Sequence, residues 1–237
     1  VNGLGYEGWI DRLVRASGSK APVLVASQGV AVRRVRGPGG PGGPGGLADP
    51  HAWQSLVAAQ RYVENIRAAL VAARPQQAAA IGARAAAYSG QLAALDTRVR
   101  ARLAAIPPGE RRIVTSHDAF GYLAEAWGLD MRAAQGWTTA GEASAADVAR
   151  LIRQLRAQQA RALFVENISD PRLVERIARE AGARVGGTLY SDALSPPGSR
   201  ADSYLKLMTH NAETLLAALG AGEAGRSTGS STDKERR

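Results

Sequence analysis

The chain has 237 residues, 45% of them hydrophobic, and carries a formal net charge of +9. No stretch approaches the roughly 20 consecutive apolar residues of a membrane helix, so the sequence predicts no membrane span. Because there is no cysteine, disulfides, thiolate metal sites and cysteine nucleophiles are excluded.

The basic charge makes nucleic acid a natural first hypothesis for a partner. The arginines, however, are scattered along predicted helices, on faces opposite the apolar residues. The densest internal basic cluster, residues 33–36, has no aromatic residues interleaved with it to stack on bases. We therefore expect no nucleic-acid partner and interpret the charge as a solvated arginine-rich surface.

Short elements and a glycine-rich segment make up the start of the chain. The pattern predicts a helix over residues 9–16 and a strand over residues 23–26. Residues 37–46, GPGGPGGPGG, hold only about three collagen-like triplets, too few for a triple helix, so a flexible surface loop is expected. No signal peptide is visible, and residues 1–3 are typical of the end of a buried strand. We expect that an upstream part is missing.

A helix is predicted over residues 53–73, and the strongest periodic signal of the chain follows it. Apolar side chains recur at spacings of three and four over about seven turns. Pro75 suits the first turn of this second helix, and Pro107 and Pro108 end it. About 30 helical residues span about 45 Å, more than the width of a small domain. The pattern favours one continuous rigid helix over residues 76–105 that links two lobes.

Strands and helices alternate beyond residue 111. The predicted strands are 113–115, 131–137, 162–165 and 185–190, and the predicted helices are 122–127, 144–159, 171–181 and 201–219. Alternation with short connections predicts a parallel sheet covered by helices on both faces. The last residues, 220–237, are small, polar and charged, and we expect them to be disordered.

Polar side chains follow three of the predicted strands. His117, Glu166 and Asp192 each come at or just after a strand end. Because ligands of an open parallel sheet bind beyond the carboxyl ends of its strands, these residues are expected at one edge. Nitrogen and carboxylate donors without sulfur suit zinc, manganese or iron. A lone strand-end aspartate is more often a helix cap or turn residue, so this alternative stays open.

The other two histidines occupy different contexts. His51 follows the glycine-rich segment and directly precedes a predicted helix. His210 lies inside the last predicted helix, with Glu213 three residues further on. Two such groups alone make a poor metal site, so a surface ion pair or a structural histidine is predicted for His210.

Five segments closely resemble the metal-specific solute-binding proteins of ABC importers, and they occur in the order of that family. They are VNGLGYEGW (1–9), DPHAW (49–53), TSHDAFGYLAEAWGLD (115–130), LFVENISDPRLVERIARE (163–180) and GARVGGTLYSDALS (182–195). Each is weak alone, but together they are specific, and the resemblance covers residues 1 to 219. It implies a two-lobed protein without catalytic activity, which holds one metal ion in a cleft and delivers it to a permease.

Carried over by position, the resemblance implies that His51, His117 and Asp192 are metal ligands, with Glu166 a supporting group nearby. The family's first ligand, a histidine upstream of residue 2, has no counterpart in the sequence. Manganese-type members often have glutamate at the position of His117, so the histidine favours zinc over manganese. The glycine–proline segment stands where zinc-type members often carry a histidine-rich loop, and it offers no ligand.

The predicted fold is α/β, with two lobes of parallel sheet covered by helices, joined by one long rigid helix; the N-terminal lobe is expected to be incomplete. We divide the chain into a remnant of an incomplete N-terminal metal-binding lobe (1–74), a linking helix (75–106), a C-terminal metal-binding lobe (112–219) and a tail (220–237). A monomer in the periplasm, or a lipoprotein at the cell surface, is expected. Three alternatives remain: a metal-assisted hydrolase with Glu166 as base, an adhesin-like surface protein, and a fragment without function.

Overall fold

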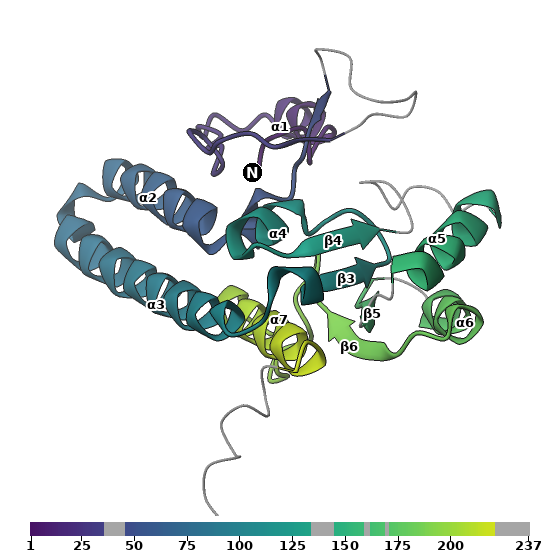
Figure 1. The fold of residues 1–237 in the computed structure, drawn as a ribbon. Coiled ribbons are helices and arrows are strands. Elements are labelled where there is room, and N and C mark those ends of the chain that lie inside the picture. The colour runs from purple at the N-terminus through teal and green to yellow at the C-terminus, as the bar shows by residue number, and fades with distance from the viewer. Residues whose placement is uncertain (36–45, 134–144, 159–161, 169–170, 221–237) are drawn as a thin grey trace, which may run out of the picture.

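The computed structural model describes residues 1–35, 46–133, 145–158, 162–168 and 171–220 (Figure 1). The predicted glycine-rich loop and the predicted tail lie outside these ranges, apart from Gly46 and Gly220, as does the predicted strand beyond residue 133. Among the helices of the described ranges, none is both long and apolar enough to cross a bilayer.

The first part of the chain is built from short elements. They are α1 (Ile10–Ala16), β1 (Arg34–Val35), β2 (Leu47–Ala48) and the 3-10 turn η1 (Ala52–Gln54). The β1 and β2 strands pair antiparallel. The strand predicted over residues 23–26 is wrong: the stretch has no strand assignment, and Ala26 begins a turn. Two backbone hydrogen bonds join it to Val1, through Leu24 and Ala26, and two such bonds are too few for a β-ladder.

Two long helices form an antiparallel hairpin beside the rest of the fold (Figure 1). They are α2 (Leu56–Ala73) and α3 (Ala78–Ala104), with the 3-10 turn η2 (Pro75–Gln77) between them. The predicted continuous helix is therefore present, with its first residues in the tighter turn. Its buried face holds Ile81, Leu92, Leu95, Asp96, Val99 and Leu103. The three- and four-residue spacing of this face is the reason the helix packs along its length.

A four-stranded parallel sheet occupies the second half of the chain, in the order β4-β3-β5-β6. After the 3-10 turn η3 (Pro108–Glu110), its elements in chain order are β3 (Arg112–Thr115), α4 (Gly121–Trp127), β4 (Asp130–Ala133), α5 (Ala145–Gln158), β5 (Ala162–Glu166), α6 (Pro171–Ala181), β6 (Val185–Leu189) and α7 (Tyr204–Ala218). The central strand β5 is buried throughout, as expected of a strand covered on both faces.

Alternate side chains of the central strands enter two separate cores. Ile113 and Phe164 belong to a large cluster with residues of α2, α3, α4 and α7. Val114 and Leu163 belong to a smaller cluster with residues of α5 and α6. The sheet is thus covered on both faces, and the long α3 helix packs into the same core as α7. The predicted α/β class is confirmed.

Candidate metal site

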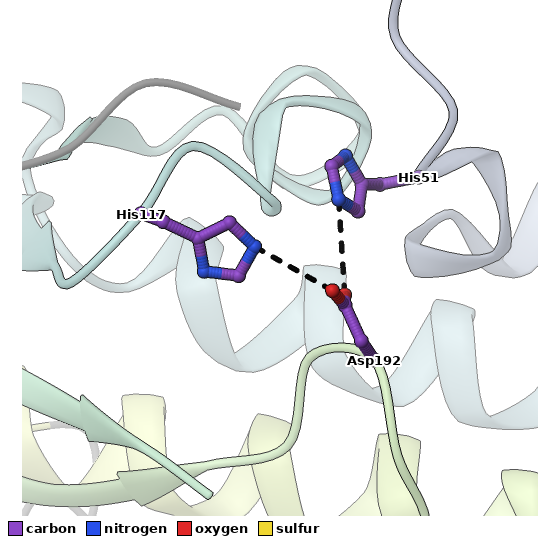
Figure 2. Close-up of side chains that lie close together, drawn as sticks. All are labelled: His51, His117 and Asp192. Carbon is purple, nitrogen blue, oxygen red and sulfur yellow. Dashed lines mark ion pairs between the residues drawn. The ribbon is translucent and has the colours of Figure 1, made fainter. Parts of the chain in front are cut away.

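Three residues far apart in the sequence converge at the carboxyl edge of the sheet (Figure 2). His51 lies directly before η1, His117 follows β3 by two residues, and Asp192 lies in the loop after β6. One potential ligand atom from each lies within 4.8 Å of the others. Nε2 of His51 is 3.7 Å from Asp192 Oδ1, and Nε2 of His117 is 3.7 Å from Asp192 Oδ2. Both imidazoles are buried.

Each histidine places its second ring nitrogen against a buried carboxylate. His51 Nδ1 lies 2.7 Å from Asp49 Oδ1, and His117 Nδ1 lies 2.5 Å from Glu166 Oε2. A carboxylate at this position holds the proton on Nδ1 and raises the basicity of the opposite nitrogen. Both Nε2 atoms are thereby prepared to donate a lone pair toward the side of the site where Asp192 lies.

Glu166 is the last residue of β5 and is fully buried. Its Oε1 accepts a hydrogen bond from the backbone N–H of His117 at 2.8 Å, while its Oε2 contacts the ring. Burial lowers the pKa of His117, but the interactions with Glu166, together with the charges of Asp192 and Asp118, outweigh burial and raise it. The carboxylate therefore fixes both the backbone and the ring of this residue.

Asp49 is fixed from two sides. It accepts a hydrogen bond from the backbone N–H of His51 at 3.0 Å, and Arg33 Nη1 donates to its other oxygen at 2.7 Å. Burial alone would raise the pKa of Asp49, but the hydrogen bonds from His51 and Arg33 outweigh burial and lower it. Asp49 thus stays ionised beside His51, although its side chain has no exposure to solvent.

Asp192 is the most exposed of the three converging residues, with 17% of its side chain accessible. Burial raises the pKa of Asp192, while the nearby histidines, His51 and His117, oppose that rise. Burial thus disfavours the ionised form of Asp192, and a cation placed between the three donors would stabilise that form. The arrangement offers two imidazole nitrogens and one carboxylate, a donor set that suits a transition metal.

His210 lies apart from this cluster on α7. Its Nε2 lies 2.9 Å from the backbone oxygen of Thr188, and its ring packs edge-on against Tyr190 at 5.1 Å between centroids. Glu213 instead pairs with Arg102 of α3 at 2.5 Å. Within the described ranges, His51, His117 and Asp192 form the only group of three or more histidines and carboxylates close enough together to hold a metal ion. His210 therefore occupies a structural position.

The sequence reasoning missed the residues that hold His51 in place. Asp49 stands two positions before it in DPHAW, where an aspartate is also typical of a turn. Arg33 was noted only as part of the basic cluster 33–36, which was interpreted as solvated surface. Its guanidinium lies over Gly121, where a Cβ atom would come within 2.1 Å of it. A glycine at the start of α4 is the only trace of this contact in the sequence.

The chain is similar to known metal-binding proteins. The chain matches the family described as "Zinc-uptake complex component A periplasmic" over residues 1–218. It is 30% identical over 219 residues to the manganese-binding lipoprotein MntA of Halalkalibacterium halodurans, covering 92% of this chain and 70% of the relative. It is 34% identical to the zinc-binding protein TroA of Treponema pallidum over 72% of this chain and 57% of TroA.

The solved structures show the same fold. The periplasmic zinc-binding protein TroA superposes with a TM-score of 0.82 at 29% identity, covering 92% of this chain and 79% of that one. A manganese-bound periplasmic metal-binding protein of Candidatus Liberibacter asiaticus gives a TM-score of 0.78 at 27% identity, over 92% of this chain and 79% of that one. The resemblance predicted from the five segments is confirmed. The matching proteins are periplasmic or lipoprotein substrate-binding proteins and not enzymes, so the expectation of a non-catalytic family is confirmed too.

Proposed function

Because the chain belongs to the family of periplasmic zinc-uptake component A proteins, we propose that it binds Zn²⁺ at His51, His117 and Asp192. Metal binding on behalf of an ABC importer is the function of the family's substrate-binding proteins. The observation that carries the proposal is the meeting of two Nε2 atoms and a carboxylate, each imidazole supported by its own buried carboxylate. The bound ion is cargo, passed on to a permease.

The donor chemistry favours zinc among the metals named for the relatives. TroA is named for zinc, MntA for manganese, and YfeA of Yersinia pestis for iron. Two imidazole nitrogens suit zinc better than manganese, which prefers oxygen donors. Glu166 lies on the far side of His117 from Asp192, where it supports the ring rather than acting as a hydrolytic base.

The layout of the site also supports the division into parts that deliver its ligands. His51 comes from the segment before α2, whereas His117 and Asp192 come from loops of the parallel sheet. We infer that residues 1–74 and 112–219 act as the two sides of the metal cleft, with the helix of 75–106 between them in the chain. Because the similar proteins are periplasmic proteins or lipoproteins, we place this protein in the periplasm or on the cell surface as a lipoprotein.

The test is a calorimetric titration of the chain with Zn²⁺ and, separately, with Mn²⁺. We expect one zinc ion per chain, tighter binding of zinc than of manganese, and loss of zinc binding in His117→Ala. His210→Ala is the matched control, because His210 bonds only within the structural region near α7. Equal zinc binding by all three proteins would contradict the proposed site. Tighter binding of manganese would contradict the choice of metal and leave the site standing.

A further inference from the structure

The loop that carries Asp192 is held by amide side chains through its backbone. Asn211 of α7 accepts from the backbone N–H of Tyr190 at 2.9 Å and donates to its carbonyl oxygen at 2.8 Å. Asn167, after β5, accepts from the N–H of Ser191 at 3.2 Å and donates to the carbonyl oxygen of Ala193 at 3.1 Å. The hydrogen bonds of these two amides involve other atoms of the loop and leave out the carbonyl oxygen of Ser191.

That carbonyl oxygen is bound by the turn that follows His51. Trp53 Nε1 donates to it at 3.0 Å, and Gln54 Nε2 donates to it at 2.8 Å. A carbonyl oxygen has two lone pairs, and these two donors occupy both. The turn also accepts a hydrogen bond: the Tyr204 hydroxyl, at the start of α7, donates to the carbonyl oxygen of Trp53 at 2.5 Å. We call this set of three hydrogen bonds the turn–loop bridge.

The turn–loop bridge joins the two halves of the site next to its ligands. Trp53 and Gln54 are two and three residues after His51, and Ser191 directly precedes Asp192. Gln54 is fully buried, so its amide cannot exchange this bond for one to water without movement of the turn. Separation of His51 from Asp192 must therefore break the bridge as well as the metal bonds.

We propose that Gln54 is a positioning residue that sets how fast bound metal leaves the site. The inference rests on the proposed function and adds to it a control of release. Gln54 does not contact the metal; it acts through the Ser191 carbonyl, which fixes the adjacent Asp192 relative to His51. The bridge forms only when the turn and the loop meet, so its loss accelerates opening more than it slows the first encounter with metal.

The primary variant is Gln54→Leu, which keeps the approximate size of the side chain and removes its donor. Loss of a supporting hydrogen bond around a metal site typically costs 10- to 100-fold in affinity. We expect the dissociation rate of the metal, measured by stopped-flow chelator competition, to rise about 10-fold. The association rate should change by less than about threefold, because affinity differences at one site lie mostly in dissociation.

Two further variants separate positioning from a structural effect. Gln60→Leu is the matched control, since the Gln60 amide donates to the Leu56 carbonyl of its own helix, at 3.3 Å, and takes no part in the turn–loop bridge. Tyr204→Phe removes one hydroxyl from the same bridge, and should raise the dissociation rate about three- to tenfold while the protein stays folded. The absorption spectrum of bound Co²⁺ should match that of the parental chain in all variants that bind, because no ligand has changed.

The outcomes distinguish this inference from the proposed function. A faster release in Gln54→Leu and Tyr204→Phe, with Gln60→Leu unchanged, supports it. Lower melting temperatures with an unchanged dissociation rate would overturn it and leave Gln54 a structural residue. If His117→Ala loses metal while both bridge variants release it at the parental rate, the proposed role of Gln54 is contradicted and the proposed metal site is supported. If His117→Ala binds as the parental chain does, the site is wrong and the inference falls with it.

Discussion

His51 and His117 face Asp192 through the same ring nitrogen, Nε2, because each holds Nδ1 against a carboxylate. Each carboxylate accepts a hydrogen bond from the backbone N–H of its own histidine. Asp49 accepts a further hydrogen bond from the guanidinium of Arg33. The His51 side of the site is therefore sensitive to a residue that touches neither the histidine nor the metal.

Arg33→Met should destabilise the protein by leaving Asp49 buried without its cation. Breaking a buried ion pair by removing one partner costs about 3 to 5 kcal/mol, and we expect the lower end because Arg33 is partly exposed. Urea unfolding of the metal-free protein measures the change. Arg132→Met is the control, since Arg132 pairs with Asp130 on the surface, where such pairs contribute about 0 to 1 kcal/mol. Equal losses in both variants would contradict the role given to Arg33.

Acidification should weaken zinc binding through His117. A protonated imidazole cannot ligate a metal, so the proton competes with zinc for Nε2. Glu166 raises the pKa of His117 against the effect of burial. The competition therefore persists to a higher pH than for an ordinary histidine, and affinity rises as pH increases through this raised pKa. Titrations between about pH 6 and 8 should show tighter binding and proton release. An affinity that is flat over this range would be inconsistent with histidine ligation.

At the scale of elements, α3 is the longest helix of the described chain and contains two glycines, Gly82 and Gly90. Neither has a neighbouring atom where a Cβ would stand. The contrast is Gly121 at the start of α4, where a Cβ would meet the guanidinium of Arg33. Replacing glycine with alanine should therefore raise the free energy of unfolding where the space is open and lower it where Arg33 fills the space.

Gly90→Ala should raise the free energy of unfolding by about 1 kcal/mol, because alanine loses less backbone freedom in a helix. Gly121→Ala should lower it, since the added methyl group displaces Arg33 from Asp49 and Glu125. Thermal or urea unfolding of both variants beside the parental chain checks the signs. A gain of stability in Gly121→Ala would show that Arg33 is not held over this glycine.

Elements with a clear period could be predicted from the sequence, and contacts between distant segments could not. The predicted helix over 171–181 agrees with α6 residue for residue, since its apolar face and Pro171 define it locally. The strand predicted over 23–26 failed because a strand needs a partner, which composition does not reveal. Glu166 was found because it ends a strand; Arg33 was not, because its role depends on Asp49 and α4 meeting in space.

At the scale of the molecule, the site joins segments that share one core. Buried residues of α2 and α3, among them Leu56 and Leu92, pack in the same cluster as Leu189 of β6 and Leu215 of α7. A ligand that binds this folded arrangement, and not the unfolded chain, stabilises all of these segments together. Metal binding should therefore appear as a change in global stability.

Zinc should raise the melting temperature of the whole protein. At a free zinc concentration 100 times the dissociation constant, the expected stabilisation is about 2.7 kcal/mol. Differential scanning calorimetry with and without zinc measures it. His117→Ala should show no zinc-dependent shift, while His210→Ala should shift as the parental chain does. A shift retained in His117→Ala would place the metal elsewhere on the molecule.

The adjacent strands β3 and β5 suggest how the metal preference of such a protein can evolve. After β3 the chain continues to β4 on one side of the sheet, and after β5 it continues to β6 on the other side. Ligands of open parallel sheets bind where two such connections diverge. His117 and Glu166 stand at the ends of these strands, whereas the two apolar cores lie on the faces of the sheet. Mutation can therefore exchange donors at this edge, and with them the preferred metal, while selection for a stable interior acts on a different set of residues.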